Sequence, residues 1–532
     1  MLILRQLRVS CLLVLAGAIA CASQRASRER DAASQSAVTT ASPSSSEPRQ
    51  LSARSASAGS TSTDGASAGK ASGPAPAPTT LDPFGKGYPP ALPSSPEFGS
   101  VASKTWGSWI HPKPDSRSLP LGGIRIGDSV AALGPPVRSG LGECQAYVPV
   151  AHGFACADRR NTTDMTHPFI QASRWTQPAE GAFPYHYAFS LGAPMLTRIP
   201  TEKENRWSTG PRNHRRARGW EVGHDELTEQ EPIAANGPIP DFLQHGGSAP
   251  NLWGKKPGLF FKKAPFGAMI AYTRAFEAEG EVWVLSTNMT IVPAKGLLRF
   301  RRSTFQGVEL SADVKLPIAW ARKQARPKYV LRGEVLEKTG DIWPARSWVG
   351  LSGAERKQGG ERFLETTTSG VYVAASDVRV AEQRKKPPWE IKYSPNRKWV
   401  HAQVRRGTLT LYEGARPVFT TLMSTGKDGS TPYGRYWIES KHHVTTLTNE
   451  MGEPRKAWVA DVPWTQYFKR PYAIHAAYWH EDFGEIKSAG CVNLSPTDAK
   501  RVFDWTEPTF VPEWGTVQGY GMGHGTFILV EG

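Results

Sequence analysis

Residues 474–494 read IHAAYWHEDFGEIKSAGCVNL, and the reactive side chains of this stretch decide how the chain is interpreted. Cys491 follows a turn of small residues, and His475 lies sixteen positions upstream of it. A cysteine nucleophile needs a base that takes its proton and backbone N–H groups that bind the oxyanion of the tetrahedral intermediate. Gly490 lets the backbone approach a substrate carbonyl closely, so we expect the amides of Gly490 and Cys491 to form this oxyanion site. The stretch therefore predicts acyl transfer through a thioester.

Further motifs lie in order around this stretch. They are WVHAQVRRGTLTLYEGARPVFTTLMSTG at 399–426, TPYG at 431–434, VPW at 462–464, IH at 474–475 and SAGCVNL at 488–494. In this order they resemble the L,D-transpeptidases, the YkuD-type catalytic domain, whose motif is His, a loop, then Ser/Thr-His-Gly-Cys-x-Asn/Arg. The resemblance covers roughly residues 390–532.

The resemblance implies a β-sandwich with the cysteine at the mouth of a groove and one helix after it. Cys491 would be the nucleophile, and His475 would take and return the proton. The other matching positions would orient or support the site: Gly490 as an oxyanion N–H, the carbonyl of Ala476 beside the His475 ring, and Ser488 and Asn493 at the active-site turn. Tyr478, Trp479 and Phe483 are candidates for the groove lining, with core packing, the commoner role of such aromatics, as the alternative.

The resemblance also implies the substrate, a peptidoglycan tetrapeptide stem. Cys491 would attack the carbonyl after the third residue, D-Ala would leave, and an amine on a neighbouring stem or protein would attack the thioester. No metal or organic cofactor is implied. With water as the acceptor, the enzyme would instead be a carboxypeptidase or would release wall-linked proteins.

The active-site stretch departs from the family pattern at one residue. Ala489 stands where the family usually has His, and the loop of twelve residues between His475 and Ser488 is short for the family. A non-catalytic wall-binding protein with a degenerate active site is therefore the alternative from another class. His480 is the competing base, and Glu481 and Asp482 are expected to be solvated loop acids.

The N-terminus has the pattern of an export signal. Arg5 and Arg8 precede the apolar run Val9–Ala20, which at twelve residues is too short to span a bilayer. The sequence at 18–21 resembles a lipobox, so we expect a lipoprotein-type signal at 1–21 with lipidation of Cys21. Cleavage without lipidation is the alternative. The predicted location is the cell envelope, periplasm or outer membrane, with the membrane as a partner through the lipid.

Residues 22–98 are rich in Ser, Ala and Pro, and most of this segment has no aromatic residue. Such a sequence buries too little apolar surface to offset chain entropy, so we expect a disordered linker. The formal net charge is +16. Because the basic residues are scattered and no nucleic-acid module signature occurs, we expect an anionic envelope partner and no nucleic acid.

Cysteine usage agrees with export. Cys144 and Cys156 are separated by a spacing that suits a disulfide across a hairpin, and an oxidising compartment favours that bond. Cys491 then remains as a free thiol. A zinc site is disfavoured because no second cysteine pair exists.

Residues 100–390 read as β-rich, so the expected fold class is mainly β. A weak repeat places a Gly turn between two strands three times, at 144–158, 274–288 and 362–377. The units resemble bacterial SH3-type barrels, with generic β-structure as the alternative. We expect β-rich modules, SH3-like or generic, at 99–200 and 261–389, an irregular insertion at 201–260, and the catalytic domain at 390–532.

Overall fold

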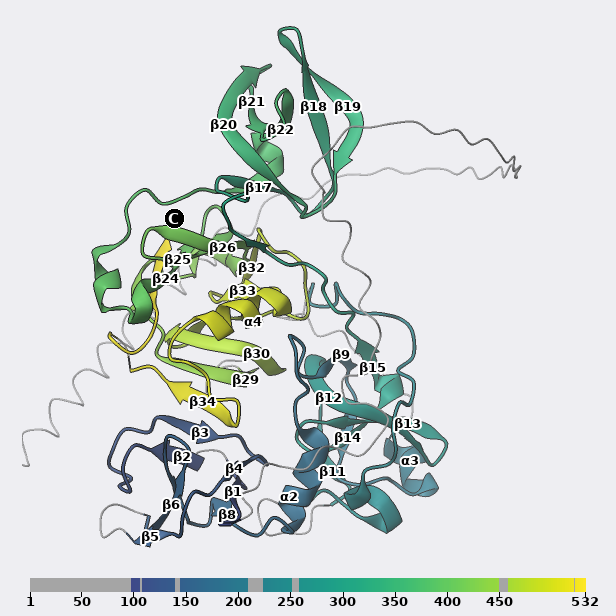
Figure 1. Cartoon of the computed structure of the whole chain (residues 1–532). Helices are drawn as coiled ribbons and strands as arrows, with labels where there is room; N and C mark the ends of the chain where they lie inside the picture. Colours follow the sequence, from purple (N-terminus) through teal and green to yellow (C-terminus); the bar gives the residue numbers. More distant parts are fainter. Residues whose placement is uncertain are drawn as a thin grey trace, which may run out of the picture. The chain divides into compact units, whose positions relative to one another are not determined.

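The computed structural model describes residues 97–105, 108–138, 144–208, 223–250, 258–448, 458–520 and 522–532. The predicted signal peptide, Cys21 and nearly all of the predicted linker lie outside the described residues. Strands dominate the described part of the chain, which confirms the mainly β class (Figure 1). No helix in that part is long and apolar enough to cross a membrane.

Three modules before the catalytic domain share one set of strand pairings. The first contains β1(Ser100–Ser103), β2(Ser108–His111), β3(Gly122–Ile124), β4(Ser129–Ala131), β5(Val137–Arg138), β6(Ala146–Val150), β7(Gly153–Cys156) and β8(Asn161–Thr162). The second contains β9(His186–Leu191), β10(Pro194–Leu196), β11(Phe260–Lys263), β12(Phe266–Ala278), β13(Glu281–Ser286), β14(Ile291–Pro293) and β15(Leu297–Arg299). The third contains β17(Ile318–Ala321), β18(Arg326–Arg332), β19(Val335–Trp343), β20(Trp348–Gln358), β21(Glu361–Thr366), β22(Val371–Ala374) and β23(Val378–Ala381).

In each module the opening strand pairs with the last strand and with the strand that follows a hairpin. These pairs are β1–β8 and β1–β4, β9–β15 and β9–β12, and β17–β23 and β17–β20. The hairpin also pairs back onto the penultimate strand, through β2–β7, β10–β14 and β18–β22. The chain therefore repeats one topology three times, and assigning it to the SH3-like class remains a prediction.

The structure corrects the predicted boundaries of the second module. Its first two strands, β9 and β10, precede residue 200, and β11 starts at Phe260. The segment between β10 and β11, 197–259, is therefore inserted inside this module and includes α3(Glu202–Ser208) and the short helix η2(Asp241–Gly246). The predicted repeat is also out of register there. Gly280 is in the β12–β13 turn, whereas Gly153 and Gly370 lie in the turns one strand later.

The disulfide predicted from the cysteine spacing is confirmed. Cys144 and Cys156 are bonded, with their Cα atoms 5.9 Å apart. Cys156 ends β7, which pairs with β6 in the hairpin that the spacing indicated. Tyr147 is fully buried beside the bond and belongs to the same hydrophobic cluster. The first module is therefore cross-linked through its own core.

The C-terminal domain, from residue 390 onward, is a two-sheet sandwich, as the resemblance implied. One sheet has the order β16(Val308–Glu309), β26(Arg416–Leu422), β25(Thr408–Glu413), β24(Lys398–Gln403), β35(Phe527–Glu531) and β28(Gly434–Trp437). The other contains β34(Trp514–Gln518), β29(Ser440–Thr448), β30(Trp458–Lys469), β31(Tyr472–Ala476) and β33(Val492–Leu494). One hydrophobic cluster joins both sheets to α4(Pro496–Trp505).

Two modules extend the second sheet of the sandwich by backbone pairing. β3 of the first module pairs with β34, with Gly122 opposite Val517. β12 of the second module pairs with β30, with Met269 opposite Val459. The third module makes its contacts through side chains, which are described with the site below.

Helix α4 begins as its sequence predicts. Ser495 accepts a hydrogen bond from the Asp498 amide at 3.1 Å, and Pro496 takes the first helical position, where a missing N–H costs nothing. At the other end, Nζ of the buried Lys441 donates to the carbonyls of Phe503 and Thr506 at 2.6 and 2.8 Å. Both ends are therefore satisfied, which fixes the helix that follows Cys491.

Removing the cap gives a measurable prediction. We expect Ser495→Ala to lower the free energy of unfolding by about 1 kcal/mol, because the Asp498 amide loses its side-chain acceptor. Thr497→Ala is the matched control, because Thr497 lies in the first turn of the helix and is not the capping residue. Urea unfolding of both variants checks this, and equal losses in the two would contradict the role of the cap.

Candidate active site

Two parallel strands bring His475 and Cys491 to one face of the sheet. β31 pairs with β33, with Ile474 opposite Val492 and His475 opposite Asn493. Cys491 comes one residue before that register, so it shares the face of His475 through the alternation of side chains. Neighbouring strands lie about 4.8 Å apart, so side chains near one another in the register on one face can approach each other.

His475 is held in one tautomer. Its Nδ1 lies 2.9 Å from the carbonyl oxygen of Ala476, and because a carbonyl only accepts, Nδ1 carries the proton. Nε2 therefore has the free lone pair. Burial lowers the pKa of His475 to about 4, although the bond to Ala476 opposes this shift. The ring is thus a neutral base at neutral pH, in the orientation that the sequence predicted.

Cys491 is half-buried and is the free cysteine of the described residues. Its Sγ lies 3.9 Å from the carbonyl oxygen of Pro471. Burial raises the pKa of the thiol to about 11, and a hydrogen bond from the Ala473 amide partly opposes this. At neutral pH the thiol and the imidazole are therefore both uncharged, so a thiolate at Cys491 would form only with loss of the thiol proton.

Ser488 braces the turn that carries Cys491. Its Oγ donates to the carbonyl of Cys491 at 2.6 Å and accepts from the amide of Gly490 at 3.1 Å. Gly490 has φ +138°, and an added Cβ would lie 2.5 Å from the Tyr472 ring, so only glycine fits. The structure corrects one expectation. The amides of Gly490 and Cys491 were predicted to be the two oxyanion donors, but the Gly490 N–H donates to Ser488 instead. Of the two, the Cys491 N–H remains as the candidate donor.

Asn493 ties this turn to the rest of the domain. Its backbone exchanges two hydrogen bonds of 2.9 Å with Ser424, and its side-chain amide lies 3.1 Å from Nε2 of His480. Nδ1 of His480 accepts from the Asp482 amide at 3.1 Å, and its Nε2 faces Nδ2 of Asn493, so both ring nitrogens have neighbours within the domain. His480 therefore has a structural role and is not available as the competing base.

Part of the chain is similar to known proteins. Residues 397–519 match the family described as YkuD, the L,D-transpeptidase catalytic domain. We call the segment that this family model matches the YkuD domain. A solved L,D-transpeptidase from Stackebrandtia nassauensis is 27% identical, with 25% of this chain and 55% of that chain covered and a TM-score of 0.19. One from Enterococcus faecium is 20% identical, with 25% of this chain and 49% of that chain covered and a TM-score of 0.20. One from Mycobacterium smegmatis is 17% identical, with 44% of this chain and 89% of that chain covered and a TM-score of 0.21. The match spans about half the length of the first two, and no curated protein matches the chain.

The predicted groove aromatics of the YkuD domain are core residues instead. Tyr478, Trp479 and Phe483 are 1%, 6% and 1% exposed and belong to one hydrophobic cluster. Tyr478 stacks on Tyr187 of the second module, with ring centroids 3.7 Å apart, and Phe483 stacks on Phe305 at 5.4 Å. These neighbours are distant in sequence, so the local pattern could not show that the aromatics are covered.

The acids of the active-site loop are also not solvated, contrary to expectation. Glu481 and Asp482 are each 7% exposed, and with Glu485 they are paired with cations of the second and third modules. We call this set the loop clamp: Glu481 with Arg301 and Arg346, Asp482 with Lys323, and Glu485 with Arg322 and Arg379. Burial alone would raise the pKa of Asp482, but hydrogen bonds from Lys323 and Lys487 outweigh it and lower that pKa.

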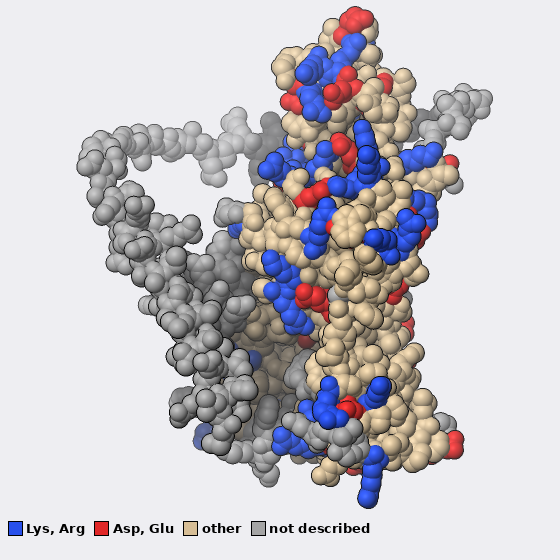
Figure 2. Space-filling view, turned by 90° about the vertical axis from the view of Figure 1, so that its left-hand side faces the viewer, with Lys and Arg blue, Asp and Glu red and all other residues tan. Residues whose placement is uncertain are grey.

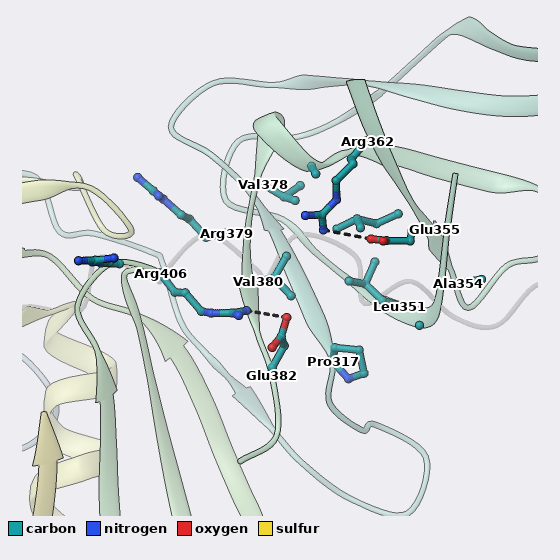
Figure 3. Close-up of a pocket in the computed structure, with 14 residues that line it drawn as sticks. Pro317, Leu351, Ala354, Glu355, Arg362, Val378, Arg379, Val380, Glu382 and Arg406 are labelled. Carbon is teal, nitrogen blue, oxygen red and sulfur yellow. Dashed lines mark ion pairs between the residues drawn. The ribbon is translucent and has the colours of Figure 1, made fainter. Parts of the chain in front are cut away.

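The loop clamp borders a cavity of about 450 Å³ between the third module and the YkuD domain (Figure 3). Arg379 lines this cavity and donates to Glu485 at 2.8 Å, while Arg362 pairs with Glu355 and Arg406 with Glu382 inside it. Most of its arginines are therefore neutralised by neighbours. Within the described ranges, no three His, Cys, Asp or Glu side chains are placed to hold a metal ion.

Proposed function

We propose that this chain is a peptidoglycan L,D-transpeptidase that works through a thioester on Cys491. The observation that supports this best is the placement of His475 and Cys491 on one sheet face inside the YkuD match. The acyl donor is a tetrapeptide stem. The Cys491 sulfur attacks the carbonyl after the third residue, and Nε2 of His475 takes the thiol proton.

The remaining steps balance that proton. His475 returns it to the amine of D-Ala, which leaves as the carbon–nitrogen bond breaks and the thioester remains. An acceptor amine then attacks the thioester and gives its proton to His475, the carbon–sulfur bond breaks as the new carbon–nitrogen bond forms, and His475 returns the proton to the Cys491 sulfur. The oxyanion donor is the Cys491 N–H, because this amide belongs to the nucleophile's own residue and so lies close to the carbon that the sulfur attacks.

Two alternatives share the same site. With water as the acceptor, the chain is an L,D-carboxypeptidase, and analysis of products separates trimmed tripeptides from crosslinked dimers. The second alternative is a non-catalytic wall-binding protein, which Ala489 favours because the usual His is replaced by an exposed residue without a titratable group. Binding to purified sacculi without release of D-Ala would support that alternative.

The chain's location is part of the proposal. The predicted signal peptide and Cys21 would place the YkuD domain in the cell envelope, tethered by a lipid through the predicted linker. Charge is compatible with an anionic envelope partner: on the face in Figure 2, Lys and Arg lie in small groups with Asp and Glu among them. The three modules would then act as SH3-like units beside the YkuD domain.

The resting protonation states predict a pH dependence. Burial sets the pKa of His475 to about 4 and that of Cys491 to about 11. We therefore expect the acylation rate to drop at pH values below about 4, where His475 becomes protonated, and to stay level between about pH 4 and pH 11. Alkylation of Cys491 by iodoacetamide should rise with pH well past 9, since only the thiolate reacts. Peptide mapping at Cys491 measures this, and a plateau reached by pH 7 would show a thiolate–imidazolium pair instead.

A further inference from the structure

A second cavity lies over β29 and β30 of the YkuD domain. It has a volume of about 530 Å³, which is within the range of sites for small ligands. It is lined by Tyr467 and Arg470 at one end and by Trp458 at the other, because Tyr467 lies opposite Ser440 on β29 and Trp458 lies opposite Thr448. Lys262 of the second module lines the Trp458 end. Two parts of the chain that are distant in sequence therefore build one site.

Strand register connects the cavity to Cys491. Tyr467 on β30 is opposite Ala473 on β31, and the Ala473 amide donates to the Cys491 thiol. Arg470 lies over the Tyr467 ring, 4.4 Å from its centroid, and the carbonyl of the next residue, Pro471, lies 3.9 Å from Sγ of Cys491. The end of the cavity formed by Tyr467 and Arg470 is thus next to the reacting sulfur.

The cavity is positively charged. Lys262 and Arg470 line it, and neither has a carboxylate partner among the residues that the structure describes. His442, also in the lining, is neutral at pH 7 because burial lowers its pKa to about 4. Nζ of Lys262 is held over the Trp458 ring, 3.6 Å from its centroid. A cation fixed in place without a counter-ion is the arrangement that binds an anion.

We propose that this cavity binds a carboxylate of the peptide substrate, with Lys262 of the second module as the residue that selects for it. The inference rests on the proposed function, because the nearby Cys491 makes a wall peptide the ligand. Both the donor and the acceptor stem carry carboxylates, and they are the two sources that the test separates. In either case a module outside the YkuD domain contributes directly to substrate binding.

The test measures binding without turnover. Calorimetry uses the full chain carrying Cys491→Ala. It gives the Kd of a tetrapeptide stem, the donor, and of a tripeptide stem, the acceptor. Each peptide is measured once with free carboxylates and once with these groups converted to carboxamides. We expect Lys262→Met to weaken one of the two carboxylate peptides by about tenfold and to leave its carboxamide unchanged. The peptide that is weakened identifies the source of the carboxylate.

Lys263→Met is the matched control, because Lys263 is the next residue on β11 and does not line the cavity. Binding of both peptides that is unchanged by Lys262→Met, or weakened equally by Lys263→Met, would overturn the inference. An acyl adduct formed by the Lys262→Met chain with unaltered KM would overturn it while leaving the proposed function intact. Binding that depends on Lys262 in a chain that never forms an adduct would overturn the proposed function alone.

Discussion

Replacing Cys491 by alanine is expected to reduce release of D-Ala from a tetrapeptide stem by at least about 10⁴-fold. The thiol is the atom that forms the covalent intermediate in the proposed reaction, and no other free cysteine occurs in the described residues. The variant removes only the sulfur from a half-buried site, so folding should persist. A chromatographic assay of free D-Ala measures the loss.

The control for this prediction is whether the Cys491→Ala variant is still folded. Thermal unfolding of Cys491→Ala should occur within a few degrees of the parent chain, since the thiol makes weak contacts, with the Pro471 carbonyl at 3.9 Å and with the Ala473 amide. Sacculus binding that survives in the variant would show that the modules still engage the wall. Undiminished release of D-Ala would exclude Cys491 as the nucleophile.

Breaking the loop clamp is the prediction with the next largest effect. We expect Asp482→Ala to lower the free energy of unfolding by about 3 kcal/mol, because Lys323 and Lys487 lose a carboxylate that is 7% exposed. We also expect acylation to slow by about 10²-fold, since the loop that carries Asp482 connects His475 to the Cys491 turn and a shift of about 1 Å is sufficient. Urea unfolding and single-turnover acylation measure the two effects separately.

Glu309→Ala is the matched control for the clamp. Glu309 pairs with Arg501 at the surface, with side-chain exposures of 60% and 34%, and such pairs contribute about 0–1 kcal/mol. A clamp that positions the loop should also lower kcat more than it raises KM, and Asp482→Asn should recover part of the loss. If Asp482→Ala slowed acylation no more than Glu309→Ala, the modules would have no part in holding the active-site loop.

The sequence predicts those parts of the site that depend on residues close together in the chain. The contact of His475 with the Ala476 carbonyl, the bracing of the turn by Ser488 and the cap at Ser495 each join atoms within three residues of one another. Their geometry follows from local motifs, so the resemblance to a family and elementary capping rules were sufficient. The disulfide of the first module was predictable for the same reason, because a hairpin brings its two cysteines together.

The interpretation was wrong where distant segments cover the site. Tyr478 was assigned to an open groove, but Tyr187 packs over it from the second module. Glu481 was assigned to solvent, but Arg301 and Arg346 reach it from 180 and 135 residues away. One sequence contains no signal for such pairings, since neither a charge nor an aromatic ring shows which distant partner it will contact.

One local expectation was also wrong, and its reason is competition for a donor. Gly490 has the conformational freedom that an oxyanion site requires, but its N–H is the nearest donor to the Ser488 hydroxyl. The serine that braces the turn therefore occupies the amide that was assigned to catalysis. The same motif supplied both assignments, and only the geometry shows that they exclude each other.

The most direct test of the central claim is intact-mass spectrometry of the full chain mixed with a tetrapeptide-stem muropeptide, in single turnover. The account predicts an added mass equal to the stem without D-Ala, located by peptide mapping on Cys491 and absent from Cys491→Ala. A folded chain that gains no mass, even with a carbapenem as a more reactive acyl donor, would contradict the thioester mechanism and favour a wall-binding role. An adduct on any other residue would contradict the assignment of Cys491.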